Sequence, residues 1–194
     1  MLLKIVQVGA EVLRQPARPL SREEILGEET PRLIEFMRET MHEAPGVGLA
    51  APQVGLPLQL AVIEDLAEYH RLVPPERLAE RERTPVPFQV LINPKIVFRD
   101  SVTAEFFEGC LSLEGFSAVV PRSRSVRVEC LDEHAAPQMI EASGWYARIL
   151  QHEIDHLEGR LYIDRMHSRT FTNLDNFSRF WKEASPTEIR AKLG

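Results

Sequence analysis

Two histidines stand four positions apart in the stretch QHEIDH (151–156), and a glutamate directly follows the first. On a helix, residues i and i+4 point the same way, so His152 and His156 can bind one metal ion through their imidazole nitrogens. Glu153 lies where its carboxylate can reach a metal-bound water as a general base. A structural metal and a hydrogen-bonded core pair are the alternatives, because buried imidazoles need partners. A third ligand would favour the catalytic site.

A cysteine from a separate segment can supply that ligand. Cys110 lies in EGCLS (108–112), outside any clear helix or strand pattern, and Gly109 lets the backbone approach a neighbour closely. A thiolate here would complete a Cys, His, His site with one open position, the layout of a catalytic metal centre. The alternative is a small buried thiol, which we favour for Cys130 on an alternating strand. We expect free thiols rather than a disulfide, as in a reducing compartment.

A glycine-rich stretch, GVGLAAPQVG (46–55), carries small residues and one amide. Its glycines exclude a long regular element, and the side chain of Gln53 can donate a hydrogen bond. A phosphate-binding loop is disfavoured because no Lys-Ser or Lys-Thr pair follows. Taken alone, the stretch predicts a tight turn between a helix and a strand.

Apolar spacing predicts the elements that must position these residues. TPRLIEFMRETMHEAPG (30–46) predicts a helix that Thr30 caps and Gly46 ends, with Pro31 in its first turn. Branched residues and period-two alternation predict three strands, at 58–64, 88–98 and 125–132. Between the first two strands, the charged segment 65–87 holds four prolines and is expected to be an exposed excursion.

The histidines lie within a second predicted helix, residues 143–159, which Ser143 can cap and Gly159 can end. Its apolar residues lie on more than one face, so we expect protein to surround it. The segment 173–194 has apolar residues at helical spacing that should pack one face: Leu174, Phe177, Phe180 and Trp181. Because strands and helices do not alternate regularly, we predict an α+β fold in one compact domain, residues 1–194.

The overall composition excludes several classes of protein. The chain has 194 residues, a formal net charge of −6 and no apolar run long enough to cross a bilayer, so no membrane association is expected. Basic residues are interleaved with acidic ones, which disfavours direct nucleic-acid binding because phosphate contacts need a basic face. The N-terminal stretch lacks the pattern of a signal peptide, and a cytoplasmic location is expected.

Taken together, GVGLAAPQ, EGCLS and QHEIDH, in this order, resemble the three signature motifs of the peptide deformylases. The resemblance runs from VLRQPA to RLYIDRM and is greatest to the branch shared by organelles and some bacteria. It implies antiparallel or mixed sheets around a central, buried metal-binding helix. It also implies that Glu153 is the general acid/base and that Gln53 and the backbone N–H of Leu111 are oxyanion donors. The implied metal ligands are Cys110, His152 and His156.

The resemblance further implies removal of the formyl group from formyl-methionyl nascent polypeptides, with release of formate. A metal-bound hydroxide would attack the formyl carbon while Glu153 transfers the proton. The expected native ion is Fe²⁺, with Zn²⁺, Ni²⁺ or Co²⁺ as substitutes, and transient proximity to the ribosome is expected. Helical spacing places Trp145, Arg148 and Ile149 beside the metal. Four residues are predicted to line the methionine pocket: Val47, Gly48, Trp145 and Ile149.

Two departures and two rivals accompany this interpretation. Ser117 stands where many bacterial members have a peptide-binding arginine, and Gly9-Ala10 replaces the usual Pro-Asp pair. The basic C-terminal helix of some bacterial members is not obvious in this sequence.

A zinc endopeptidase is the nearest rival function, but His167 is the only later histidine that could serve as its third ligand. A metal-stabilised binding module is the other rival, and it has no need for Glu153 or an open coordination position.

Overall fold

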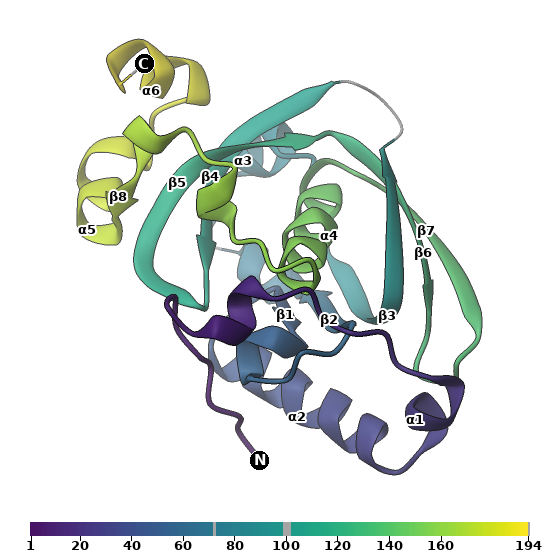
Figure 1. The fold of residues 1–194 in the computed structure, drawn as a ribbon. Helices are drawn as coiled ribbons and strands as arrows, with labels where there is room; N and C mark the ends of the chain where they lie inside the picture. The colour runs from purple at the N-terminus through teal and green to yellow at the C-terminus, as the bar shows by residue number, and fades with distance from the viewer. Residues whose placement is uncertain (72, 99–101, 194) are drawn as a thin grey trace.

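Two antiparallel sheets and a helix between them make up the fold in the computed structural model, which describes residues 1–71, 73–98 and 102–193 (Figure 1). The larger sheet has the order β1-β2-β3-β6-β7, and the smaller has the order β4-β5-β8. The larger sheet consists of β1 (Gly48–Ala50), β2 (Leu60–Asp65), β3 (Val86–Phe98), β6 (Ser125–Leu131) and β7 (Pro137–Ser143). The smaller consists of β4 (Thr103–Cys110), β5 (Leu113–Ser123) and β8 (Thr172–Asn173). The predicted α+β class is confirmed.

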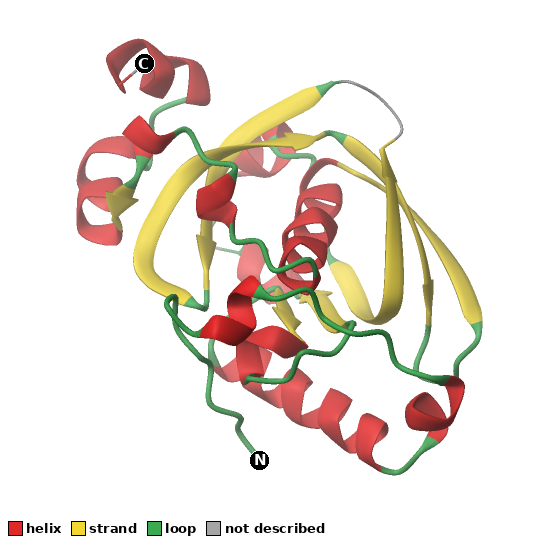
Figure 2. Ribbon diagram, in the orientation of Figure 1, coloured by secondary structure: helices red, strands yellow, loops and turns green. Residues whose placement is uncertain are grey.

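The helices differ in length and in role (Figure 2). α2 (Glu29–Glu43) packs against β1 and β2, and α4 (Gly144–Leu157) contacts strands of both sheets. The shorter helices are α1 (Arg22–Leu26), α3 (Pro75–Glu80), α5 (Leu174–Asn176) and α6 (Pro186–Leu193). Single turns fill the connections: η1 (Glu11–Arg14), η2 (Ala51–Val54), η3 (Ala67–His70), η4 (Tyr162–Asp164), η5 (Ser168–Thr170) and a π-helical turn η6 (Phe177–Trp181). No helix within the described ranges is both long and apolar enough to span a bilayer.

Apolar side chains on both sides of the larger sheet build the core. One cluster joins α2 to the sheet through residues such as Met37, Met41 and Val62. A second joins α4 to the sheet through Val128, Leu150 and other branched residues. The metal-binding candidate helix is therefore held from several directions, as its apolar residues on more than one face predicted.

Two predictions, a helix cap at Thr30 and a continuous apolar face after residue 173, are wrong for physical reasons. Thr30 does not cap α2, because Glu28 occupies the N-cap position and the Thr30 hydroxyl instead donates to the Glu24 carbonyl at 2.6 Å. The segment after residue 173 does not pack one continuous apolar face. Leu174 and Phe180 are exposed, while Phe177 packs against Phe107 of β4. The π-helical turn changes the spacing on which the predicted face depended.

The segment 65–87 is mostly exposed, as predicted, but both of its ends are buried. Residue 72 lies outside the described residues. Asp65 ends β2 and Val86 begins β3, and the two residues pair across the sheet. η3 and α3 fill the excursion between them. The segment therefore leaves and re-enters the core at Asp65 and Val86, and Glu82 lies beside Gly144, the first residue of α4.

Candidate active site

The helix α4 presents the His-Glu-x-x-His residues in a buried setting. Ser143 occupies its N-cap position, although its side chain makes no capping hydrogen bond there. The helix ends at Leu157, and Gly159 follows with a φ of +74°. A β-carbon at this glycine would lie 2.8 Å from the backbone carbonyl of Arg14, so glycine is required for the chain to pass. This stop anchors the helix against the N-terminal segment.

Cys110, His152 and His156 lie together in space. One ligand atom from each lies within 4.8 Å of the others, and Cys110 Sγ is 3.3 Å from His156 Nε2. Two ligands on one tetrahedral zinc or similar ion would be about 3.5 Å apart, given bond lengths of about 2.0–2.3 Å. Cys110 is the last residue of β4, not a residue outside strands as the sequence indicated. The donor set and its spacing fit one divalent ion.

Burial opposes charge on both imidazoles, but their neighbours shift the two pKa values in opposite directions. Burial, aided by the charges of His152 and Arg122, lowers the pKa of His156 well below its ordinary value. Burial also opposes charge on His152, but hydrogen bonds and charge from Cys110 and Glu108 raise its pKa well above the ordinary value. His156 Nδ1 is buried without a partner in the described residues. A cation beside the Cys110 thiolate would favour neutral imidazoles as its ligands.

Glu153 lies against the glycine-rich stretch. A β-carbon at position 48 would lie 2.6 Å from its Cδ atom, so only Gly48 leaves room for this carboxylate. Glu153 Oε2 is buried without a hydrogen-bond partner among the described residues, and burial raises the pKa of Glu153 to about 7. A carboxyl group poised near neutrality can both accept and release a proton.

The amide of Gln53 is oriented by its own turn. The stretch 46–55 forms the short strand β1 followed by η2, consistent with the expectation that no long element fits there. Gln53 Oε1 accepts from the backbone N–H of Ala50 at 2.8 Å, which turns Nε2 toward Cys110 Sγ at 3.6 Å and Ser112 Oγ at 3.3 Å. The donor end of the amide therefore faces the candidate metal ligands.

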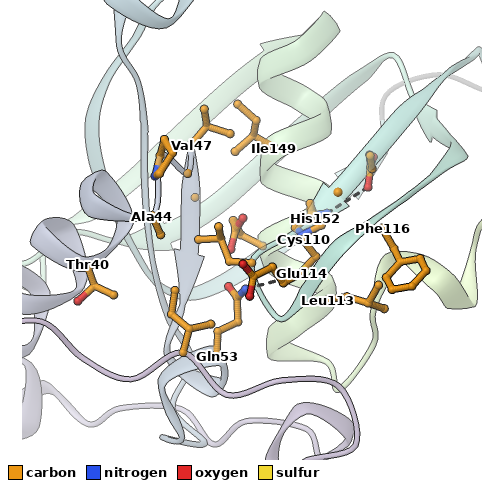
Figure 3. A pocket seen from close by; sticks show the side chains of 18 of the residues that line it. Thr40, Ala44, Val47, Gln53, Cys110, Leu113, Glu114, Phe116, Ile149 and His152 are labelled. Atoms are coloured by element: carbon orange, nitrogen blue, oxygen red, sulfur yellow. Dashed lines mark hydrogen bonds and ion pairs between the residues drawn. The ribbon is translucent and has the colours of Figure 1, made fainter. Parts of the chain in front are cut away.

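These groups line a cleft of about 890 Å³, large enough for a peptide segment. Figure 3 shows Val47 and Ile149 on one side of it, near Cys110 and His152. Gly48, Trp145 and Leu111 also line it, and Leu111 belongs to the turn that joins β4 to β5. The structure thus brings together every sequence-predicted site residue, and their individual roles stay predictions.

Comparison with known proteins decides the family. A sequence model described as polypeptide deformylase matches residues 2–172. The chain belongs to the polypeptide deformylase family. Peptide deformylase 3 of Streptomyces avermitilis is 48% identical over 99% of this chain and 84% of its own length. The chloroplastic peptide deformylase 1A of Solanum lycopersicum is 48% identical over 89% of this chain, which spans 62% of the tomato protein. These relatives confirm the resemblance to an organelle and bacterial branch.

Solved structures show the same deformylase fold. The Met-Ala-Ser-bound peptide deformylase of Acinetobacter baumannii superposes with a TM-score of 0.76 at 29% identity, covering 86% of this chain and 99% of that one. Peptide deformylases remove N-terminal formyl groups, so membership places this chain among hydrolases of that kind.

Within this deformylase fold, the carboxylate of Glu108 orients the first histidine. His152 Nδ1 lies 3.0 Å from Glu108 Oε2, while Arg122 Nε and Nη2 each donate to this carboxylate at 2.9 Å. Arg148 also donates to Glu108, and Arg122 reaches Asp155 one turn beyond the histidine. Although burial alone would raise it, Arg122 and His152 hold the pKa of Glu108 well below its usual range.

Our reading of the sequence missed Glu108 and its arginines. The sequence did hold a signal, because Glu108 stands two residues before Cys110 and a metal-binding histidine commonly donates the N–H of its other ring nitrogen to a carboxylate.

Ser117, which stands in place of an arginine found in many bacterial members, is buried on β5 and its hydroxyl has no partner in the described residues. Ser117 is not among the residues that line the cleft in the described part of the chain.

Replacing Glu108 with glutamine should weaken both the fold and the metal site. The change removes the charge that pairs with Arg122 and Arg148, so the free energy of unfolding should fall by about 3 kcal/mol. Metal affinity should fall by about 10–100-fold, because His152 loses its orienting acceptor. Urea denaturation and chelator competition measure the two effects. Glu129→Gln on the exposed side of β6 is the matched control, and equal losses in both variants would refute the assignment.

Proposed function

We propose that this chain is a metal-dependent peptide deformylase that removes the formyl group from formyl-methionyl peptides and nascent chains, releasing formate. The observation that carries the proposal is the convergence of Cys110, His152 and His156 beside Glu153 at the cleft. We propose Fe²⁺ as the native ion, with Zn²⁺, Ni²⁺ or Co²⁺ as substitutes, because thiolate and imidazole ligands suit all of these metals. Cytoplasmic location and ribosome proximity stay predictions.

The three ligand residues would hold the ion, which would polarise the formyl carbonyl and lower the pKa of water in its open position. Glu153 supplies the proton transfers. Its Oε2, which no group in the described part of the chain hydrogen-bonds, accepts the proton of the attacking water and then delivers it to the departing amine nitrogen. A pKa of about 7 suits a group that must serve as base and then as acid in a single turnover near neutral pH.

Gln53 and Leu111 stabilise the negative charge that develops on the formyl oxygen. Gln53 Nε2 already faces the ligands, and its orientation is fixed by the hydrogen bond that Oε1 accepts from Ala50. The backbone N–H of Leu111 comes from the turn directly after the ligand Cys110. Donors held in place before reaction stabilise the transition state without reorganisation.

Loss of the Gln53 donor should slow catalysis without removing the ion. We expect Gln53→Glu to lower kcat/KM for formyl-Met-Ala-Ser by about a hundredfold, because a carboxylate cannot donate to the developing oxyanion. Oε1 of the new side chain can still accept from Ala50. Steady-state formate release and metal analysis measure the two quantities. A variant with wild-type kcat/KM would show that Gln53 is not an oxyanion donor.

The apolar part of the cleft fits the methionine side chain. Val47, Trp145 and Ile149 line it beside the ligands, and Gly48 leaves room for the Glu153 carboxylate. The formyl carbon carries only hydrogen, so a cleft lined by the small residues of the stretch 46–55 would admit it and exclude bulkier acyl groups; a β-carbon at Gly46 would already lie 2.8 Å from Leu111 Cδ1. The proposed substrate is therefore a formylated, not an acetylated, methionyl terminus.

The proposed function is tested with anaerobically purified protein. Formate release from formyl-Met-Ala-Ser should be rapid, while acetyl-Met-Ala-Ser and internal peptide bonds should resist cleavage. Metal analysis of the same sample should find one ion per chain and identify it. Cleavage of internal bonds without formate release would instead support a zinc endopeptidase.

A further inference from the structure

The segment 65–87 reaches the cleft through one arginine. Arg83 is the residue of this segment, among those described, that lines the cleft, where it joins Val47, Trp145 and Ile149. Its side chain is only 12% exposed. A long basic side chain at the apolar end of a substrate pocket requires a specific partner, because an isolated buried charge is costly.

Asp65 is that partner and fixes the guanidinium in place. Arg83 Nε and Nη2 each donate to an Asp65 carboxylate oxygen at 2.8 Å, a bidentate pair. The Asp65 side chain is fully buried, and His70 Nε2 lies 3.1 Å from Asp65 Oδ1, the oxygen that also accepts from Arg83 Nη2. Asp65 is the last residue of β2, whereas Arg83 lies in the loop three residues before β3 begins at Val86, so the ion pair holds this loop against the larger sheet.

Trp145 completes the arrangement from the first turn of α4. The guanidinium of Arg83 lies 5.5 Å from the indole ring, and that of Arg81 lies 4.9 Å from it. Arg148 contacts the same ring at 5.7 Å, and Phe106 meets it edge-on at 6.1 Å. The indole is therefore held on several sides and cannot swing away without breaking these contacts.

We propose that Arg83 and Trp145 form the rigid end wall of the methionine pocket and set the length of the side chain that the enzyme accepts. This inference rests on the proposed function. Asp65 is a positioning residue that acts through Arg83. Val47 and Ile149 supply apolar contact that favours any aliphatic side chain, whereas the wall stops a longer one. Displacing the wall would separate a buried ion pair, so the pocket does not lengthen to admit a larger substrate.

The test compares two formylated peptides that differ only in the length of the first side chain: formyl-Met-Ala-Ser and formyl-2-aminooctanoyl-Ala-Ser. The variant is the double substitution Asp65→Asn/Arg83→Ala, which shortens the wall without leaving an unpaired buried carboxylate. We expect the ratio of kcat/KM for the longer peptide over the methionyl peptide to rise by about tenfold or more, mainly through KM.

Arg81→Ala is the matched control, because it removes a cation from the same indole ring but does not line the cleft. Its selectivity ratio should match that of the wild type. The single variant Arg83→Lys keeps the charge and most of the length, so it should restore selectivity for methionine. The proposed end wall would be refuted if the selectivity ratio were unchanged in an active double variant, or if Arg81→Ala changed that ratio equally. Absence of formate release from wild-type protein would instead refute the proposed function.

Discussion

Glu153→Gln should lower formate release by about a thousandfold while the protein keeps its metal. Glutamine has the shape of glutamate, so it fits against Gly48, where a β-carbon would leave no room for the natural side chain. It cannot accept a proton, however, and the reaction needs one group to take a proton from water and return it to the amine. The buried Oε2 of Glu153, which has no hydrogen-bond partner among the described residues, is the atom we assign to this transfer.

The comparison needs a matched substitution on the same helix. Glu158→Gln lies at the exposed C-cap of α4, where the side chain forms a surface ion pair with Arg160. It should leave turnover within about twofold of the wild type, as expected for a surface pair. Single-turnover formate release at saturating substrate compares the two variants. Activity of Glu153→Gln within tenfold of wild type would mean that another group carries the proton.

Cys110→Ala should lose the metal, with affinity falling on the order of a thousandfold or more, because thiolate ligation contributes much of the binding free energy of such sites. The sulfur lies 3.3 Å from His156 Nε2 and accepts from the backbone N–H of Ser112 at 3.4 Å, so it is already placed for ligation. Metal analysis after dialysis against a defined chelator measures the loss.

The second cysteine provides the control for this experiment. Cys130 is buried on β6, where desolvation raises the pKa of its thiol to about 11, as expected for an unreactive core residue. Cys130→Ala should retain one ion per chain. Retention of metal by Cys110→Ala, or its loss from Cys130→Ala, would reverse the assignment of the two cysteines.

The sequence predicted the site better than it predicted the strands around it. Residue type and helical spacing place His152, Glu153 and His156, because i and i+4 neighbours share a face whatever the rest of the fold does. β4 and β5 were not predicted, although β4 ends in Cys110, the candidate thiolate ligand. Glu108 and Arg122 are buried on these strands as an ion pair. Because both residues are charged, the sequence pattern suggests exposed positions where the structure has core positions.

Long-range partners were beyond a reading of local patterns. The segment 65–87 was correctly expected to be mostly exposed, but nothing in its composition pairs Arg83 with Asp65 or brings it to Trp145. Likewise, Thr30 has a side chain that suits a helix N-cap, yet its hydroxyl donates a hydrogen bond to the carbonyl of Glu24 in α1. In both cases local propensity was overridden by a contact outside the element itself, between β2 and the loop before β3 for Arg83 and between α1 and α2 for Thr30.

The central claim is that one thiolate and two imidazoles share a single ion. X-ray absorption at the metal edge of anaerobically purified protein tests it most directly. The predicted spectrum has one sulfur at about 2.3 Å and two imidazole nitrogens at about 2.0–2.1 Å, with any remaining position filled by a light atom that substrate can displace. A first shell without sulfur, or one closed by four protein ligands, would contradict the account.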